Sequence, residues 1–154
     1  MDIYTDGATS MNGNENAQGG WAFVVVDEDG GIVMKNSGYV EKATNNICEL
    51  LAAINACDAV RAIPSNITIW SDSAYIVNCY KDKWYKKWQI NGWRNSKNEP
   101  VANKELWQQL IPFFENDKYN FNKIKGHSGN KWNELVDEMA VEARIYGKHS
   151  DTTL

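Results

Sequence analysis

Cysteine is scarce in this sequence, and its three copies form no recognisable site. Cys48, Cys57 and Cys79 are unevenly spaced and include no CxxC pair. A structural zinc site needs clustered thiolates or imidazoles, and a disulfide framework needs paired cysteines in an oxidising compartment. The composition therefore excludes both, and we expect buried thiols in the reducing cytoplasm.

Long apolar runs and an N-terminal leader are also missing. No uninterrupted apolar stretch approaches the roughly 18 residues of a membrane-spanning helix, so we expect no membrane association. Met1-Asp2 leads directly into Ile3 without a basic and apolar leader, and we expect no secretory signal. With 154 residues, of which 43% are hydrophobic, the chain suits one domain with a real core. No large exposed apolar patch is evident, so we expect a monomer.

A net positive charge, the usual mark of a nucleic-acid-binding protein, is absent as well. The formal net charge is −4 at pH 7. The charge is uneven, however, because residues 81–104 carry seven basic and two acidic residues, a local charge of +5, whereas the rest of the chain carries −9. A basic patch on an acidic body can bind a polyanion locally, so the overall charge does not exclude a nucleic-acid ligand.

The chain alternates between strand and helix patterns, which predicts an α/β fold with a mixed sheet. Strands are expected over residues 3–7, 21–26, 32–39, 67–70 and 119–125. Helices are expected over residues 44–62, from residue 73 onward, over 104–114 and over 131–146. The second and third strands have the pattern of an antiparallel hairpin, which the first strand joins at one edge. A single domain would then span residues 1–146, followed by a polar, frayed tail over residues 147–154.

Four acidic residues occupy positions that core packing does not require. Asp6 and Asp72 are expected to end two central strands, while Glu49 and Asp137 lie off the apolar seams of their helices. Each has an ordinary alternative: a turn for Asp6, a helix cap shared with Ser73 for Asp72, and a solvated helix face for the other two. If the two strands are neighbours, the carboxylates meet at one end of the sheet, where α/β folds place their ligands.

Carboxylates gathered in this way favour a particular chemistry. Several of them stay ionised in a small space only when cations neutralise their charge. Oxygen ligands without histidine or cysteine suit Mg²⁺ or Mn²⁺ rather than zinc. Two such ions, roughly 3.5–4 Å apart, can clamp an in-line phosphoryl displacement, one activating water and the other stabilising the leaving oxygen. No serine or cysteine nucleophile is then required.

Five short motifs are spread along the chain. They are Tyr4-Thr5-Asp6-Gly7, Thr44-Asn45-Asn46-Ile47-Cys48-Glu49-Leu50, Ser71-Asp72-Ser73, Lys125-Gly126-His127-Ser128-Gly129 and Asn133-Glu134-Leu135-Val136-Asp137. In this order and spacing they resemble the type 1 ribonuclease H family over nearly the whole chain. The resemblance implies a ribonuclease H-like fold, with a five-stranded mixed sheet whose first three strands are antiparallel and which helices flank. It also implies Mg²⁺-dependent endonucleolytic hydrolysis of the RNA strand in RNA–DNA hybrids, leaving 5′-phosphate and 3′-hydroxyl ends.

The resemblance assigns catalytic roles residue by residue. It places two metal ions, Mg²⁺ with Mn²⁺ as a substitute, on the four carboxylates Asp6, Glu49, Asp72 and Asp137. His127 matches the family's loop histidine, which assists proton transfer or product departure, and an imidazole can do either near pH 7. The alternative is a loop histidine that is merely exposed to water.

The resemblance also covers substrate contacts. Thr44, Asn45 and Asn46 resemble the family's contacts to sugar and phosphate, and an asparagine side chain can both donate to and accept from a 2′-hydroxyl, the group that distinguishes RNA from DNA. Helix capping is their alternative role. The loop after Asp6 departs from the bacterial pattern, which leaves open whether Asn12, Asn14 or Asn16 touches RNA. Ala74 stands where several relatives carry an RNA-contacting polar residue, so that contact is not carried over.

Residues 83–94, which we call the protrusion, resemble the family's basic segment that grips the DNA strand. The residues expected to contact substrate there are Lys83, Trp84, Lys86, Lys87 and Trp88. The lysines supply phosphate attraction. Of the three tryptophans of the protrusion, Trp84, Trp88 and Trp93, two are expected chiefly to pack it onto a neighbouring helix.

Two other interpretations are a nuclease of the same fold that acts on DNA and a hybrid-binding module without activity. The Thr-Asn-Asn segment and the basic protrusion count against the first interpretation. The complete set of four carboxylates counts against the second.

Overall fold

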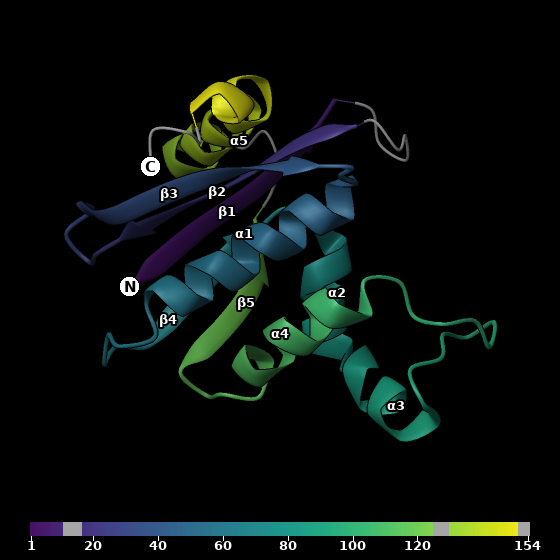
Figure 1. Cartoon of the computed structure of the whole chain (residues 1–154). Helices are drawn as coiled ribbons and strands as arrows, with labels where there is room; N and C mark the ends of the chain where they lie inside the picture. The colour runs from purple at the N-terminus through teal and green to yellow at the C-terminus, as the bar shows by residue number, and fades with distance from the viewer. Residues whose placement is uncertain (11–16, 125–129, 151–154) are drawn as a thin grey trace.

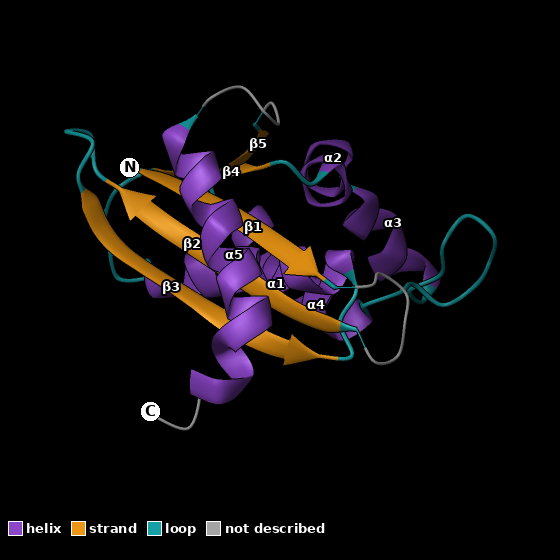
Figure 2. Cartoon of the chain, turned by 90° about the horizontal axis from the view of Figure 1, so that it is seen from above, coloured by secondary structure: helices purple, strands orange, loops and turns teal. Residues whose placement is uncertain are grey.

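Five strands form one mixed sheet with helices on both faces (Figures 1 and 2). The computed structural model describes residues 1–10, 17–124 and 130–150, with side chains described as far as residue 147. The strands lie in the order β3-β2-β1-β4-β5. Their bounds are β1 Asp2–Thr9, β2 Gln18–Val26, β3 Ile32–Glu41, β4 Ile67–Ser71 and β5 Tyr119–Lys123. The first three strands are antiparallel and the other pairs are parallel, which confirms the predicted sheet.

The helices form two layers of unequal size. Helix α5 covers the face made by β1, β2 and β3, while α1 and α4 lie on the opposite face (Figures 1 and 2). Helix α3 extends from the end of α2 away from the sheet (Figure 1). The bounds are α1 Asn45–Ala59, α2 Ala74–Asp82, α3 Trp84–Asn91, α4 Lys104–Phe114 and α5 Lys131–Ser150. No helix within the described ranges combines the length and apolarity needed to cross a membrane.

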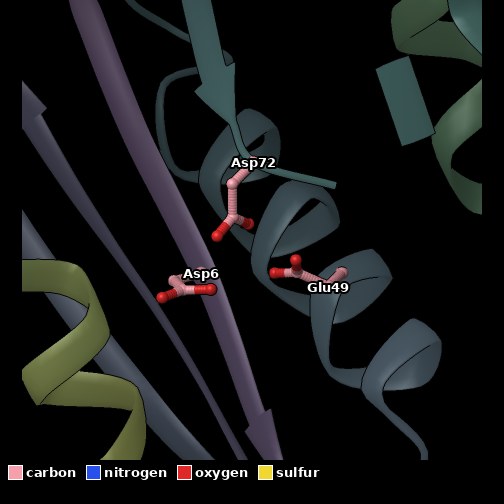
Figure 3. Close-up of side chains that lie close together, drawn as sticks. All are labelled: Asp6, Glu49 and Asp72. Atoms are coloured by element: carbon pink, nitrogen blue, oxygen red, sulfur yellow. The ribbon is translucent and has the colours of Figure 1, made fainter. Parts of the chain in front are cut away.

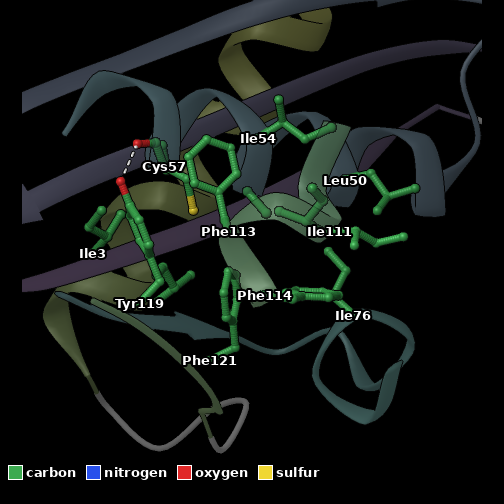
Figure 4. Packing of buried hydrophobic residues seen from close by; sticks show 14 of the residues in the cluster. Ile3, Leu50, Ile54, Cys57, Ile76, Ile111, Phe113, Phe114, Tyr119 and Phe121 are labelled. Atoms are coloured by element: carbon green, nitrogen blue, oxygen red, sulfur yellow. Dashed lines mark hydrogen bonds between the residues drawn. The ribbon is translucent and has the colours of Figure 1, made fainter. Parts of the chain in front are cut away.

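The larger core lies on the α1 side of the sheet and is rich in aromatic rings (Figure 4). Phe114 packs edge-on against Phe121, with ring centroids 4.8 Å apart. The Tyr119 hydroxyl donates a hydrogen bond to the carbonyl oxygen of Cys57 at 3.3 Å, so this polar group is paired inside the core. A smaller aliphatic core around Val136 holds α5 on the other face. Helices therefore pack on both faces of the sheet, and a functional site is expected at one of its ends.

The predicted bounds of α4 are confirmed, but α1 ends at Ala59 rather than near Ala62. The cause lies far away in the sequence. The ammonium group of Lys118 donates to the carbonyl oxygens of Val60 at 2.9 Å and Arg61 at 3.1 Å, and these bonds hold the chain in a turn after the helix. Carbonyl groups at a helix end need such partners, and a partner from a distant turn leaves no local signal.

Two further differences concern α3 and α5. Helix α3 was not predicted, because α2 and α3 are separated only by Lys83, whose backbone is left-handed with φ of 57°. Glycine at that position would have marked the break, whereas lysine gives no such signal. Helix α5 continues to Ser150, so the residues predicted to begin a frayed tail at position 147 are helical.

Candidate metal-binding active site

Three carboxylates from three elements converge at one end of the sheet (Figure 3). Asp6 lies in β1, Glu49 lies in α1, and Asp72 directly follows β4. One oxygen atom of each lies within 4.8 Å of the others. Strands β1 and β4 are parallel neighbours in which Tyr4 pairs with Trp70, so Asp6 in β1 and Asp72 just after β4 each lie two residues beyond this pair. The two strands are therefore neighbours, as the predicted convergence of Asp6 and Asp72 required.

The prediction that Asp6 ends its strand at a turn is wrong. Strand β1 continues to Thr9, and Gly7 lies inside it. A Cβ atom on Gly7 would lie 2.6 Å from Cβ of Cys48 and 2.7 Å from the backbone nitrogen of Glu49. Glycine is required at this position because α1 crosses β1 at van der Waals contact. The same close approach brings Glu49 beside Asp6.

The carboxylate of Asp72 is not used as a helix cap. Ser73 is the N-cap of α2, and its hydroxyl oxygen accepts a hydrogen bond from the backbone N–H of Ile76 at 3.3 Å. The hydroxyl oxygen of Ser71 accepts one from the backbone N–H of Ser73 at 3.0 Å, and both serines are buried. The two serines thus fix the junction between β4 and α2, and Asp72 remains available for a ligand.

Burial and repulsion raise the pKa values of the two inner carboxyl groups. Desolvation, followed by the charge of Asp72, raises the pKa of Asp6 to about 8, although the backbone N–H of Gly7 donates to its Oδ1 at 2.8 Å and opposes the shift. Desolvation, followed by the charges of Asp6 and Asp72, raises the pKa of Glu49 well above its ordinary value. Without a cation the site therefore retains protons that a cation would displace.

Glu49 also carries an unsatisfied atom. Its Oε1 is buried and has no hydrogen-bond partner among the described residues. A buried acceptor without a partner costs about 1–3 kcal/mol, which a bound cation would recover. All donors in the cluster are carboxylate oxygens, and such a set suits a hard divalent cation. The residues therefore fit a metal ion.

Asp137 reaches the same place from the opposite layer. It is an exposed residue of α5, and its charge and a hydrogen bond to Asp6 contribute to the raised pKa of Asp6. The four carboxylates line one open hollow of about 430 Å³, together with Asn45 and Asn46. Asp137 is not a member of the tight group of three. It is an exposed member of the set of four, whereas Asp6 and Glu49 are buried.

The segment of residues 44–46 is anchored at the rim. The hydroxyl oxygen of Thr44 accepts a hydrogen bond from the backbone N–H of Ile47 at 3.1 Å, so its capping role is confirmed. The Oδ1 atom of Asn45 accepts a hydrogen bond from the Thr9 hydroxyl at 2.7 Å. Asn45 and Asn46 line the hollow, whereas Thr44 is not among its lining residues. Any contact of these residues to nucleic acid stays a prediction.

The protrusion consists mainly of α3 and the turn that follows it. Lys83, Lys86 and Lys87 are exposed, and their contacts to phosphate stay a prediction. Trp84, Trp88 and Trp93 are partly buried and pack against the larger core, which confirms the packing role predicted for two of them. A hollow of about 540 Å³ is lined by Lys83, Lys87 and Arg94 together with the rings of Trp84 and Trp88. The protrusion therefore presents positive charge on an aromatic base.

Some predicted residues lie outside the described part of the chain, and the lining residue Tyr75 was missed. His127 and the loop residues Asn12, Asn14 and Asn16 are among those not described. Tyr75 lines the acidic hollow but was not predicted as a site residue. Its place in the first helical turn, three residues after Asp72, is the signal that would have identified it.

Comparison with known proteins gives a consistent result. The family described as RNase H matches residues 1–145. The ribonuclease H of Syntrophomonas wolfei is 42% identical over 141 residues, which cover 92% of this chain and 93% of that protein. The ribonuclease H of Caldanaerobacter subterraneus is 41% identical over 142 residues, which cover 92% of this chain and 89% of that protein.

Solved structures share the fold at lower sequence identity. LC9-RNase H1, a type 1 RNase H with the type 2 active-site motif, matches with a TM-score of 0.78 and 24% identity, covering 95% of this chain and 72% of that one. LC11-RNase H1 in complex with an RNA/DNA hybrid matches with a TM-score of 0.69 and 22% identity, covering 94% and 96%.

Proposed function

The chain belongs to the RNase H family, and we propose that it is an endoribonuclease that hydrolyses the RNA strand of RNA–DNA hybrids with two divalent metal ions. The observation that supports this most directly is the acidic hollow, in which three carboxylate oxygens lie within 4.8 Å of one another and Oε1 of Glu49 has no partner in the described protein. The choice of substrate is supported by LC11-RNase H1, whose structure was solved with an RNA/DNA hybrid.

The metal ligands in this proposal are Asp6, Glu49, Asp72 and Asp137. Mg²⁺ matches an all-oxygen set best, and Mn²⁺ can substitute for it. Ions held by these residues would activate a water molecule and would stabilise the charge that develops on the leaving oxygen. In the reaction the water oxygen bonds to phosphorus and the bond to the ribose 3′ oxygen breaks. The products then carry a 5′-phosphate and a 3′-hydroxyl.

Side chains of the protein itself bind and release the protons of this reaction. Asp6 and Glu49 carry raised pKa values without metal, so they release protons when cations enter. His127 is our candidate for giving a proton to the leaving 3′ oxygen or for helping the product depart. Its imidazole can donate or accept near pH 7, and its motif, Gly126-His127-Ser128-Gly129, matches the family's.

Two surfaces select the substrate. The amides of Asn45 and Asn46 line the hollow, where they can both donate to and accept from a ribose 2′-hydroxyl. Thr44 supports them by starting α1 and is our candidate for a phosphate contact. The lysines of the protrusion are exposed beside aromatic rings, a combination that binds a phosphate backbone without reading bases. The RNA strand would thus lie at the hollow and the DNA strand at the protrusion.

We place the enzyme in the cytoplasm as a monomer. All three cysteines are buried and free, as expected of a protein kept reduced. The large exposed apolar side chains of the described residues are few, namely Ile32, Val33, Ile90, Ile145 and Tyr146. Sedimentation of the purified protein tests the oligomeric state.

A cleavage assay with labelled RNA–DNA hybrid, double-stranded RNA and double-stranded DNA, with and without Mg²⁺, tests the activity. We expect cleavage of the hybrid alone and only with metal. Asp72→Asn should lower kcat on the order of a thousandfold, since a ligand of catalytic ions contributes several kcal/mol, while hybrid binding survives. Glu138→Gln, an exposed acid on α5, is the matched control. Near-normal turnover by Asp72→Asn, or preferred cleavage of double-stranded DNA, would refute the proposal.

A further inference from the structure

The hydroxyl group of Tyr75 connects the catalytic hollow to the base of the protrusion. Tyr75 lies in the first turn of α2, three residues after Asp72, and lines the hollow. Its oxygen accepts a hydrogen bond from Nδ2 of Asn103 at 3.2 Å and another from Nε1 of Trp107 at 3.0 Å. Asn103 directly precedes α4, and Trp107 lies within it. One phenol oxygen thus joins the helix that begins beside Asp72 to the helix that supports the protrusion.

Trp107 continues this connection by ring packing. It is fully buried, and its ring centroid lies 5.0 Å from that of Tyr75 and 5.5 Å from that of Trp88. The ring of Trp88 lies in turn 6.5 Å from Trp84 and 5.8 Å from Trp93. A continuous row of aromatic rings therefore leads from the hollow to the protrusion. Closely packed rings have few alternative arrangements, so a shift at one end is transmitted to the other.

The side chain of Asn103 takes part in the same connection. Asn103 is the N-cap of α4, has a left-handed backbone with φ of 61°, and makes no side-chain capping hydrogen bond. An asparagine at an N-cap ordinarily accepts from a backbone N–H, but here its amide donates to Tyr75. The backbone N–H of Val101 donates to the carbonyl oxygen of Trp93 at 2.9 Å, which ties the segment before Asn103 back to the protrusion.

We propose that Tyr75 is a positioning residue that sets the spacing between the catalytic carboxylates and the protrusion, so that both engage one hybrid duplex. This inference rests on the proposed function. A duplex is stiff, and two contacts on it reinforce each other only where the protein holds them at the matching distance. Without the hydroxyl group, the amide of Asn103 and the indole N–H of Trp107 lose their shared acceptor. The loss should weaken hybrid binding and leave the chemistry at the carboxylates in place.

The test is a double-mutant cycle on full-length protein with a hybrid long enough to reach the protrusion. Tyr75→Phe keeps the ring that packs on Trp107, and the double variant Lys86→Ala/Lys87→Ala removes charge from the protrusion. Tyr75→Phe should raise KM about fivefold with kcat changed by less than about twofold. In the Lys86→Ala/Lys87→Ala background, Tyr75→Phe should raise KM little further, because both changes then act on the same contact between the protrusion and the hybrid.

Tyr80→Phe is the matched control, since Tyr80 belongs to the same helix and packs its ring on Phe121 in the core, with centroids 5.0 Å apart. It should leave KM and kcat unchanged. If Tyr75→Phe raises KM equally in the parent and in the Lys86→Ala/Lys87→Ala background, the coupling between Tyr75 and the protrusion alone is overturned. An unchanged KM for Tyr75→Phe would overturn it as well. A fall in kcat at constant KM would move Tyr75 into the chemistry and overturn its positioning role. If the lysine variant itself leaves KM unchanged, the proposed DNA-strand contact fails together with the coupling.

Discussion

Replacing Asp6 with asparagine should stabilise the metal-free protein at neutral pH. Asp6 is buried, with 6% of the residue exposed, and the pKa of its carboxyl group is raised from 3.8 to about 8 by burial and by the charge of Asp72. Between these two pH values the folded state binds a proton that the unfolded state has lost, so stability falls as pH rises through this window. Asparagine keeps the shape of the side chain and can still accept from the backbone N–H of Gly7, but it carries no charge at any pH.

The size of the effect follows from the shift. One pKa unit corresponds to about 1.4 kcal/mol, so the cost of Asp6 at pH 7 approaches about 4 kcal/mol if nothing screens it. The accessible rim residues Asp72 and Asp137 admit water and counterions, and we expect about 2 kcal/mol after screening. For a chain of this size that is a rise in Tm of about 4–8 °C.

Urea and thermal unfolding in EDTA at pH 4, 6 and 7.5 measure the effect. Asp6→Asn should be more stable than the parent protein at pH 7.5, and the difference should shrink to a small fraction of that value at pH 4, close to the pKa of 3.8 that the carboxyl group has in the unfolded state. Added Mg²⁺ should stabilise the parent more than the variant. Asp117→Asn, which changes an exposed acid in the turn before β5, should show none of these differences. If Asp6→Asn were no more stable than the parent at pH 7.5, the described electrostatics of the site would be wrong.

Other expectations concern binding and proton transfer. Lys86→Ala/Lys87→Ala should raise KM and reduce the slope of log KM against log salt by about 2, one for each lost phosphate contact; Lys35→Ala, an exposed lysine of β3, should change neither quantity. An unchanged salt slope would remove the protrusion from the binding surface. His127→Ala should lower kcat about 10–100-fold without ending turnover and should flatten the pH–rate profile near neutrality. An unaltered kcat would favour a histidine that is simply exposed to water.

The sheet and the site motifs were accessible from the sequence because each rests on local patterns. Alternating and helical periodicity predicted the five strands, the antiparallel pairing of the first three and the bounds of α4, whereas the complete five-stranded sheet was implied by the family resemblance. The boundaries that failed depend on contacts between distant segments. Lys118 ends α1 from 57 residues away, and Gly7 appeared as a turn signal although its missing side chain makes room for α1.

Individual roles at the site were harder to assign than its location. Asp72 and Ser73 were equally suited to cap α2, and only the hydrogen bond from Ile76 to Ser73 separates them. The role of Tyr75 depends on Asn103 and Trp107, which arrive from a helix about 30 residues later and which no pattern around Asp72 could indicate. Packing partners decide such roles, and they become visible only in three dimensions.

The position of Asp137 has a consequence for the newly synthesised chain. Asp6 belongs to β1, the first of the described elements, whereas Asp137 lies on α5, the last of them, which packs across β1, β2 and β3. Until α5 has emerged and docked, the nascent protein can assemble the inner three carboxylates but not the complete set. A chain whose synthesis stops before α5 would therefore lack the fourth carboxylate of the proposed nuclease site.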